Sequence, residues 1–593
     1  MALLMRASLA FGRRSGRHLG RATAGMSSHT PVGSPDEAGA GLVPREWPEW
    51  MPRFPTDFRP TTDIPTFRGE FSGLEAGARE RESRLAIGGR IKLVRHASKK
   101  LSFLTIESLG ETVQVLASVA NYEGREGNPA KDQFRGVMQL LRRGDWVGVS
   151  GFAGKSGKGE LSVIATRVDV LAPCEVNLPE PGQLRDEGAR AAERHRDLIV
   201  NGRRALRPHL VRAAVLASVR GSMARGGFVE VETPVLQPVA GGAIAKPFVT
   251  SSEATGRELN LRIAPELPLK TLVVGGMERV FEMGRVFRNE GVDATHNPEF
   301  TSCEAYAAYW GLAELQELTE VVVRGAAEAA GVIAAAPEDE EDAGTRSVVA
   351  GSGADLALGV PGSFVDRFAP SRLLELHPEA AEDGVSLALG RGFARVSIPE
   401  AVEAATGRPL PLLQELTEVT MGGTASDAAA RDVEARAEAA LAELLRGAGV
   451  QLPSPPTYGR MLDKLIGHVI EPACVQPTLV TDHPVLMSPL ARARQDAPWL
   501  AERFELFVLG RELCNAYGEL NDPAEQRHRF VAQVAERERR QDDEAHGMDE
   551  AFLAALRHGL PPTGGWGLGV DRLVMLLSGR PHIRDVLAFP AMR

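Results

Sequence analysis

Charged and aromatic residues recur at the alternating spacing of β-strands in two segments of the chain, the first of which spans residues 278–309. It is predicted to form two strands joined by a polar loop. Side chains alternate along a strand, so Phe300, Glu304 and Tyr306 share one face, and Arg288 has the matching parity on its own strand. An arginine fork suits a phosphate, and an aromatic face suits a purine. An ordinary hairpin with a charged loop, which is common, stays open as the alternative to a nucleotide site.

The second segment, residues 503–519, has the same character around Gly510, which predicts a tight turn between two strands. Glu505 and Glu512 lie on opposite arms near that turn. Converging carboxylates without His or Cys suit a hard divalent cation held between protein and phosphates, namely Mg²⁺, whereas a solvent-exposed pair is the alternative. Three further residues share one face of the second strand: Asn515, Tyr517 and Glu519.

The C-terminal stretch 564–577 predicts a glycine-rich strand that enters a helix at Asp571 and Arg572. Glycines, Gly569 among them, allow a ligand to approach the backbone closely. The start of a helix favours anions. The spacing is neither that of a Walker phosphate loop nor that of a dinucleotide-binding βαβ unit.

These residues need a scaffold, and 593 residues allow two to four domains. With 43% hydrophobic and 25% charged residues, the chain has a globular composition. Five short β-prone runs between residues 84 and 170 predict a small closed barrel of the OB type. The four cysteines lie far apart, which indicates reduced thiols and no metal-ligand spacing. No apolar run is long enough for a membrane span.

The barrel region differs in charge from the rest of the chain. The whole chain has a formal net charge of −10, which excludes a small, wholly basic nucleic-acid binder. Residues 84–168, however, hold fourteen Lys and Arg against seven Asp and Glu. A basic barrel inside an acidic protein predicts a nucleic-acid partner rather than a merely solvated face.

The N-terminal 35 residues contain no Asp or Glu and carry five arginines. This composition predicts a mitochondrial or plastid transit peptide rather than a secretory signal. Two alternatives stay open at this point. The segment could be a tail without a function, and a start at Met26 would leave a cytoplasmic form.

Three segments in order, namely 228–234, 287–300 and 567–572, resemble the three signature motifs of class II aminoacyl-tRNA synthetases. Within that class the chain is similar to lysyl-tRNA synthetases. The strings that carry this closer resemblance are Pro238–Phe248, Arg262–Leu267, Met461–Leu465, Asp482–Leu490 and Phe589–Met592. The resemblance implies an α+β protein with an N-terminal OB-fold β-barrel and a class II catalytic domain, an antiparallel β-sheet flanked by helices.

The resemblance also implies a domain order. The expected segments are the transit peptide at 1–35, a linker at 36–83, the anticodon-binding barrel at 84–175, a connector at 176–195, and the catalytic domain at 196–593 with a low-complexity insertion at about 334–392.

As to activity, the resemblance implies that lysine and ATP give lysyl-adenylate and pyrophosphate, after which lysine passes to the 3′ end of tRNA-Lys. The positions that would bind ATP are Arg288, Glu290, His296, Phe300, Gly569 and Arg572. Those that would bind lysine are Gly242, Glu266, Glu304, Tyr306, Asn515, Tyr517 and Glu519. The remaining matches are Glu505 and Glu512 for Mg²⁺, Phe103, Gln114 and Glu160 for the anticodon, and Pro234 for the interface of a homodimer.

Substrate choice can also be argued from charge. The related aspartyl and asparaginyl synthetases carry Gln at the position of Glu266, and an ammonium side chain requires carboxylates. Lysine is therefore expected over aspartate or asparagine. These synthetases and a tRNA-binding paralogue without activity are the alternatives. The family commonly has a larger residue at Gly518, so a slightly looser pocket is expected there.

Overall fold

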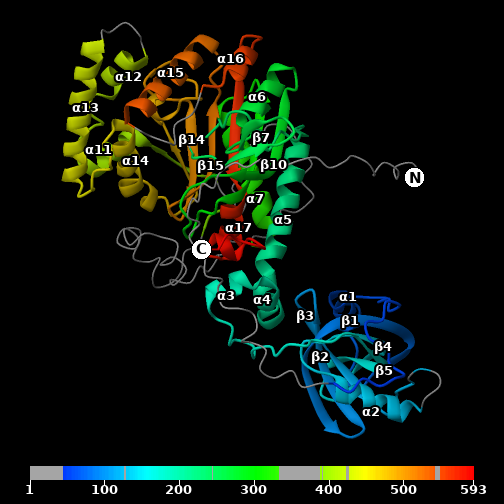
Figure 1. Ribbon diagram of the computed structural model, residues 1–593. Helices are drawn as coiled ribbons and strands as arrows, with labels where there is room; N and C mark the ends of the chain where they lie inside the picture. Colours follow the sequence, from blue (N-terminus) through cyan, green and yellow to red (C-terminus); the bar gives the residue numbers. More distant parts are fainter. Residues whose placement is uncertain are drawn as a thin grey trace, which may run out of the picture.

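The computed structural model describes residues 45–592 except 124, 126–128, 244, 333–386, 390–391, 422–426 and 541–547. The predicted transit peptide and most of the predicted insertion therefore lie outside the described residues. Near the end of the insertion, Leu387 and Leu389 are described and are buried in the main core. The described chain forms two parts, a small barrel and a large helix-flanked sheet (Figure 1).

Five strands close the barrel in the order β1-β2-β3-β5-β4, which confirms the predicted OB-type fold. In β2, buried Leu104 and Ile106 alternate with the half-buried Phe103 and Thr105, so one face fills the core and the other faces outward. One helix, α2, joins β3 to β4 and was not predicted. The bounds are β1 Arg79–Ser98, β2 Leu101–Ser108, β3 Glu111–Ser118, α2 Ala130–Leu140, β4 Trp146–Lys155 and β5 Leu161–Ala172.

The segment that precedes the barrel is part of it. Residues 36–83 were expected to be a linker with little core, and this expectation does not hold for the described part. Helix α1, Ile64–Phe71, packs on the barrel beside β3 (Figure 1), and Met51, Ile64 and Phe67 are buried in the barrel core. The frequent prolines hide any periodicity, so isolated apolar residues can anchor the segment without a recognisable pattern.

The second part is built on an eight-stranded sheet in the order β12-β13-β14-β15-β16-β11-β10-β6. Its central strands are antiparallel, as predicted, while the edge pairs β12–β13 and β10–β6 are parallel. The bounds are β6 Val229–Glu230, β10 Arg279–Phe287, β11 Glu299–Ala308, β12 Ala394–Ser397, β13 Thr478–Thr481, β14 Arg503–Val508, β15 Arg511–Gly518 and β16 Thr563–Gly569.

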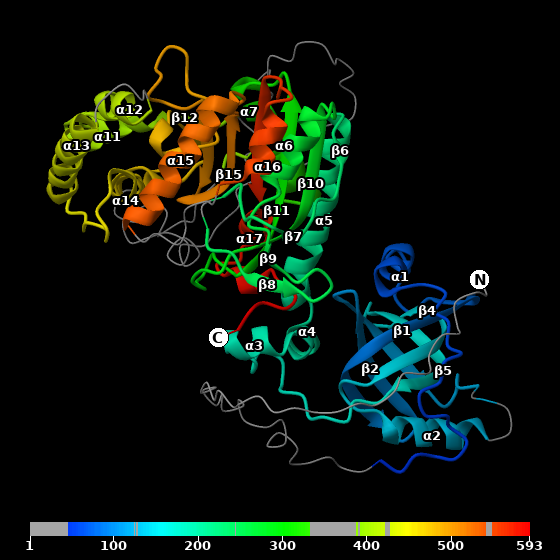
Figure 2. The same cartoon turned by 45° about the horizontal axis from the view of Figure 1, so that its top comes forward.

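Helices cover both faces of this sheet (Figures 1 and 2). The largest core cluster joins α5, α7 and α17 to one face, and α6 and α16 pack on the other beside β10 and β11. Residues 206–223, 312–329 and 427–445, whose apolar positions recur at helical spacing, lie in helices. These helices are α5 Arg203–Arg225, α6 Glu266–Val274, α7 Leu312–Ala329, α15 Pro523–Arg540, α16 Glu550–Leu556 and α17 Val570–Ser578.

Three smaller units complete the second part. Four helices form their own core beside the β12 edge of the sheet, as both views show (Figures 1 and 2). They are α11 Ile398–Thr406, α12 Leu413–Met421, α13 Asp427–Gly447 and α14 Tyr458–Val469. A three-stranded sheet has the order β7-β9-β8, with bounds Leu236–Gln237, Arg257–Leu261 and Val249–Ser252. Two short helices lead from the barrel, α3 Glu187–Ala192 and α4 Arg194–Asn201.

The two parts touch where the barrel meets the α4–α5 junction. Lys92 Nζ donates to the carbonyl of Ile199 at 2.8 Å, and Arg203 pairs with Glu111 at 2.8 Å. Among the described residues, no helix is both long enough and apolar enough to cross a membrane.

If residues 45–78 belong to the barrel, Phe67→Ala should destabilise it. Phe67 is fully buried, and truncating a buried Phe costs about 3–5 kcal/mol. Hydrogen exchange of barrel peptides, followed by mass spectrometry, should show a matching loss of protection. Phe54→Ala is the matched control, because Phe54 is 55% exposed. Equal protection in both variants would mean that the segment is a linker after all.

Candidate active site

A cavity of about 380 Å³ opens on the sheet between β10, β11, β15 and β16. It brings together residues that are up to 341 positions apart in the chain, from Gly242 to Ile583. Most of the predicted ATP and lysine residues line it: Gly242, Glu266, Arg288, Glu290, His296, Phe300, Glu304, Tyr306, Glu512, Asn515, Tyr517, Gly569 and Arg572. Glu505 and Glu519 do not line it, since they lie deeper in the protein.

The β10–β11 hairpin carries the residues that were predicted to bind phosphate and purine. The register pairs Val286 with Phe300, so the predicted common face is present. Just beyond β10, the Arg288 guanidinium stacks on the Phe300 ring, 5.2 Å from its centroid. Burial lowers the pKa of Arg288, and its Nε is buried without a hydrogen-bond partner. A cationic fork with a free donor fits an anionic ligand. Glu290 is exposed at the rim.

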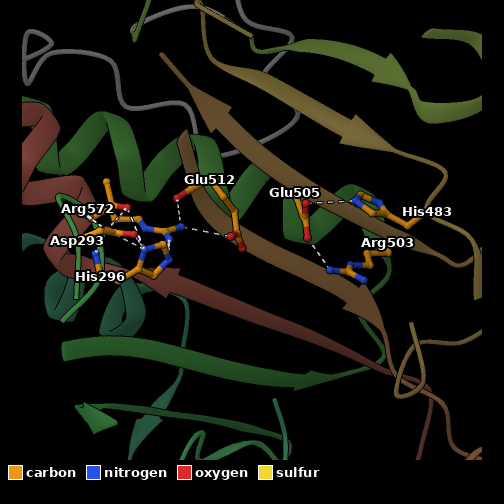
Figure 3. A network of polar contacts seen from close by, with 8 residues as sticks. Asp293, His296, His483, Arg503, Glu505, Glu512 and Arg572 are labelled. Carbon is orange, nitrogen blue, oxygen red and sulfur yellow. Dashed lines mark hydrogen bonds and ion pairs between the residues drawn. The ribbon is translucent and has the colours of Figure 1, made fainter. Parts of the chain in front are cut away.

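The polar loop after β10 is tied to the start of α17 by a chain of contacts (Figure 3). His296 Nδ1 lies 2.8 Å from Asp293, and its Nε2 lies 3.1 Å from Arg572. Arg572 Nη1 in turn donates to the backbone carbonyl of Glu512 at 2.9 Å. Although burial acts to raise the pKa of Asp293, hydrogen bonds from Thr295 and His296 outweigh it and lower the pKa to about 2. The predicted residues His296 and Arg572 are therefore neighbours.

Asp571 fixes α17 to the sheet, a role that the sequence did not indicate. Its carboxylate is buried, accepts the backbone N–H of Thr301 at 2.6 Å and pairs with Arg212. Gly569, the last residue of β16, precedes the helix directly. These bonds hold Arg572, the next residue, at the mouth of the cavity.

The predicted turn at Gly510 is confirmed, since it joins β14 to β15 with a left-handed backbone of φ 64°. A bulge lies at Leu513: Phe507 pairs with Glu512 and Glu505 with Asn515, which leaves one extra residue on β15. Strict alternation would place residues 512 and 515 on opposite faces. The bulge puts Asn515 on the face of Glu505 and Glu512 instead.

Glu505 has two basic side chains beside it in this arrangement, Arg503 and His483 (Figure 3). Arg503 donates to Glu505 Oε1 at 2.5 Å, and the buried His483 Nε2 lies 3.3 Å from Oε2. Burial acts to raise the pKa of Glu505, but these two groups outweigh it and lower the pKa to about 2. For Glu512, burial and the nearby Glu505 raise the pKa. The sequence analysis did not assign Arg503 or His483 a role.

Two further carboxylates lie close to this pair. Burial together with Asp463, Glu505 and Glu512 raises the pKa of Glu471 to about 7, and burial and Glu505 raise the pKa of Asp463. In the part of the chain that the structure describes, no group of three or more His, Cys, Asp or Glu forms a complete metal shell. The site therefore has surplus negative charge but few protein ligands, which suits a cation that is also bound by phosphates.

The other end of the cavity carries the predicted lysine residues. Tyr517 Oη donates to both carboxylate oxygens of Glu266 at 2.9 Å each, and Tyr306 Oη donates to Glu304 at 3.1 Å. Burial, followed by the negative charge of Glu266, raises the pKa of Glu304 to about 8. A Cβ on Gly242 would lie 2.8 Å from Glu266 Cβ, so only glycine fits against that side chain.

Glu519 is fully buried behind this pocket. Its carboxylate pairs with Lys270, which also contacts Glu266 at 2.5 Å. The carboxylate occupies the space beside Gly565, where a Cβ would lie 1.8 Å from Oε1. Lys270 was not predicted, although its i, i+4 spacing from Glu266 on a helix is a usable signal.

The lysine pocket was expected to be slightly looser at Gly518, and the structure does not show this. A Cβ at this position would lie 2.6 Å from Glu502 and 3.3 Å from Arg492. These two residues pair with each other at 2.5 Å, and their side chains fill the space. Gly518 lies on the strand face opposite Tyr517 and Glu519, so the pocket is closed without it.

The predicted anticodon residues lie on the outer surface of the barrel. Phe103 is half-buried, and the Arg95 guanidinium stacks 4.7 Å from its ring centroid. Gln114, on the next strand, accepts a hydrogen bond from Ser162 at 3.0 Å. Glu160 is exposed just before β5. The structure thus brings these residues to neighbouring positions on three adjacent strands, far from the cavity.

Comparison with known proteins agrees with this fold. Residues 186–593 match the family model described as tRNA synthetases class II (D, K and N). Residues 85–171 match the model described as OB-fold nucleic acid binding domain. Both matches coincide with the two structural parts.

The chain is also similar to curated proteins over most of its length. It is 38% identical to a lysine–tRNA ligase of Cladosporium cladosporioides over 91% of this chain and 81% of the relative. It is 40% identical to a probable cytoplasmic lysine–tRNA ligase of Encephalitozoon cuniculi over 85% and 86%. For a lysine–tRNA ligase of a Synechococcus strain, identity is 38% over 90% and 92%. The chain therefore belongs to the class II tRNA synthetases and, within that class, to the lysine–tRNA ligase family.

Proposed function

We infer that this chain is a lysine–tRNA ligase, which activates lysine with ATP and transfers it to the 3′ end of tRNA-Lys. The observation that supports this most is the polarity of the single cavity. Arg288 and Arg572 lie at one end, and Glu266 and Glu304 lie at the other. A ligand held between them would carry phosphates at one end and an ammonium at the other.

The chemistry requires alignment more than it requires a reactive side chain. The lysine carboxylate attacks the α-phosphorus of ATP in line, the bond to pyrophosphate breaks, and lysyl-adenylate forms. Arg288 would hold the α-phosphate and Phe300 would stack on adenine, while Arg572 and His296 would hold the terminal phosphates, with Glu290 at the rim. Fixed cations that neutralise the phosphate charge lower the barrier without a protein nucleophile.

Mg²⁺ fits the residues present. Glu505 and Glu512 offer only oxygen ligands, which Mg²⁺ prefers, and burial together with neighbouring carboxylates raises the pKa values of Glu512 and Glu471. The two carboxylates would hold the ion, and ATP phosphates and water would complete its shell. When bound, it would neutralise charge on the leaving pyrophosphate.

The proposal is tested by ATP–pyrophosphate exchange with single amino acids. We expect exchange with lysine but not with aspartate or asparagine, and its loss when EDTA removes the divalent ion. Exchange with aspartate or asparagine would identify one of the related synthetases, and no exchange with any amino acid would identify a tRNA-binding paralogue.

In the same assay, Glu266→Gln should raise the Km for lysine by tenfold or more, because the substrate ammonium loses a charged partner worth roughly 1.5–3 kcal/mol. Glu258→Gln is the matched control, since Glu258 is exposed on β9. Unchanged lysine activation in Glu266→Gln would show that the pocket is misassigned.

The barrel is proposed to read the anticodon through Phe103, Gln114 and Glu160. An aromatic ring stacks on a splayed base, and amide and carboxylate groups read its edge. Phe103→Ala should reduce tRNA charging by roughly ten- to a hundredfold, since base–aromatic stacking contributes about 1–3 kcal/mol per base. Lysine-dependent exchange should stay near the wild-type rate. Equal loss of charging and exchange would contradict the assignment.

A homodimer is proposed around Pro234. This residue is exposed, and so are its apolar neighbours Val229, Val235 and Leu236, at 51%, 39% and 48%. An exposed apolar patch of this kind is typical of a surface that another protein subunit covers. We expect a dimer in sedimentation velocity and a shift toward monomer for Leu236→Asp. Val176→Asp, at a 66% exposed site on the connector, should stay dimeric. A wild-type monomer would refute the proposal.

A further inference from the structure

The polar loop after β10, residues 291–297, contacts the last part of the chain. The backbone N–H of Ile583 donates to the carbonyl of Ala294 at 2.8 Å. The backbone N–H of Ala591 donates to Asn297 Oδ1 at 3.2 Å. Both Ile583 and Asn297 also line the cavity. The loop that was predicted to bind ATP is therefore held at two positions by residues that follow α17.

The C-terminal segment that makes these contacts, residues 583–591, has little regular structure of its own. It contains one turn of 3-10 helix, Ile583–Asp585. Val586 and Leu587 are buried, at 3% exposure or less, whereas Phe589 is 90% exposed. A buried segment outside a sheet or a long helix needs donors from elsewhere for its carbonyl groups. Its position in the protein therefore depends on side chains of other elements.

One side chain of the connector supplies such donors. Arg194, at the start of α4, is 4% exposed. Its guanidinium donates to three backbone carbonyls: those of Arg584 at 2.6 Å, Leu587 at 3.2 Å and Ala588 at 3.4 Å. Arg584 also pairs with Glu187 of α3 at 2.6 Å. The end of the chain accordingly lies beside α3 and α4 (Figure 2). A planar fork with several donors suits acceptors that converge in this way.

The charge of Arg194 is balanced within the connector. Asp197 is fully buried and accepts hydrogen bonds from Arg194 Nη1 at 3.0 Å and from Arg190 Nε at 2.9 Å. Burial acts to raise the pKa of Asp197, but hydrogen bonds from Arg190 and Asn201 and the two guanidinium charges outweigh it and lower the pKa. The carboxylate is therefore ionised at neutral pH, and it fixes the direction of the Arg194 guanidinium.

We propose that Arg194 is a positioning residue for the ATP site: it fixes the C-terminal segment, and this segment fixes the polar loop that carries His296. The inference rests on the proposed function, because the loop is taken to bind ATP. Arg194 does not line the cavity, so its effect on ATP passes through the backbone of the segment. His296 lies 3.1 Å from Arg572, and a displaced loop would separate these two groups.

The first test is Arg194→Met, which removes the donors and keeps an apolar side chain of comparable bulk. In lysine-dependent ATP–pyrophosphate exchange, the Km for ATP should rise about tenfold or more, because binding groups that are slightly misplaced lose much of their effect. The Km for lysine should stay near the wild-type value, since the proposed lysine residues lie on other elements. Equal rises in both Km values would indicate a merely structural Arg194 and would overturn the proposal.

Arg196→Met is the matched control for this variant. Arg196 lies on the same helix, two residues further along, and pairs with Glu193 at 2.7 Å on the surface. Both Km values should stay at the wild-type level in this control. A selective rise in the Km for ATP in Arg196→Met as well would mean that any charge lost from α4 has this effect, which contradicts the role assigned to Arg194.

Ala591→Pro tests the contact between the C-terminal segment and the loop while Arg194 stays in place. Proline has no N–H, so the donor to Asn297 is lost at an exposed position. The Km for ATP should rise selectively but less than in Arg194→Met, because the contact at Ala294 remains. Ala591→Ser keeps the N–H and should match the wild type. This pair decides the question even if Arg194→Met does not fold, and an unchanged Km for ATP in Ala591→Pro would overturn the proposal.

Hydrogen exchange measured by mass spectrometry follows the loop without relying on catalysis. In the protein without ligands, peptides that cover residues 291–298 should exchange faster in Arg194→Met than in the wild type, while peptides of α16 should keep their protection. A wild type that does not activate lysine would refute the proposed function alone, and the exchange of the loop would still decide the role of Arg194. Equal exchange of the loop in both proteins would show that Arg194 does not position it.

Discussion

The site depends on the pairing of β11 with β10 on one side and β16 on the other. This double pairing places Glu304 opposite Glu282 and opposite Gly567. The bond from the Thr301 backbone to Asp571 then fixes the start of α17 against the same strand. A slip by one residue would turn the whole β11 face away from the cavity, because side chains alternate. The residues proposed for the phosphate, purine and amino-acid subsites therefore depend on one register.

The site also requires that carboxylate side chains pack closely against the backbone of β16. The strand β16 carries glycines opposite the most crowded carboxylates, and Gly565 leaves the space that the Glu519 carboxylate occupies. Buried carboxylates in so small a volume repel one another and raise each other's pKa values, as Glu304 shows. The structure limits this repulsion with Lys270 in the amino-acid pocket and with Arg503 and His483 beside Glu505.

The two parts of the chain differ in the sign of their charge and in the range over which that charge acts. The acidic average of −10 conceals a basic barrel, whose outer face carries the aromatic Phe103. A basic surface attracts a polyanion over a long range, whereas the buried carboxylates of the catalytic part act only on a bound ligand. The two parts contact each other at the α4–α5 junction through Lys92 and Arg203.

The sequence by itself determined what depends on local periodicity and on ordered motifs. The five barrel strands, the two hairpins, the glycine strand leading into α17 and the helix at 312–329 follow from neighbouring residues, as does the family. Most of the predicted ATP and lysine residues line the cavity. Spacing along a strand indicated some of them, such as Phe300 and Tyr517, and the resemblance indicated others, such as Glu266 and His296.

Only the tertiary structure decided the features that arise between distant segments. The bulge at Leu513 brings Asn515 to the face of Glu505 and Glu512, and strict alternation along the strand does not predict it. His483 and Lys270 acquire their roles from carboxylates on other elements. The residues before the barrel join its core through single buried side chains such as Phe67. Burial, pairing and charge compensation are properties of the folded arrangement, since they depend on which groups lose water together.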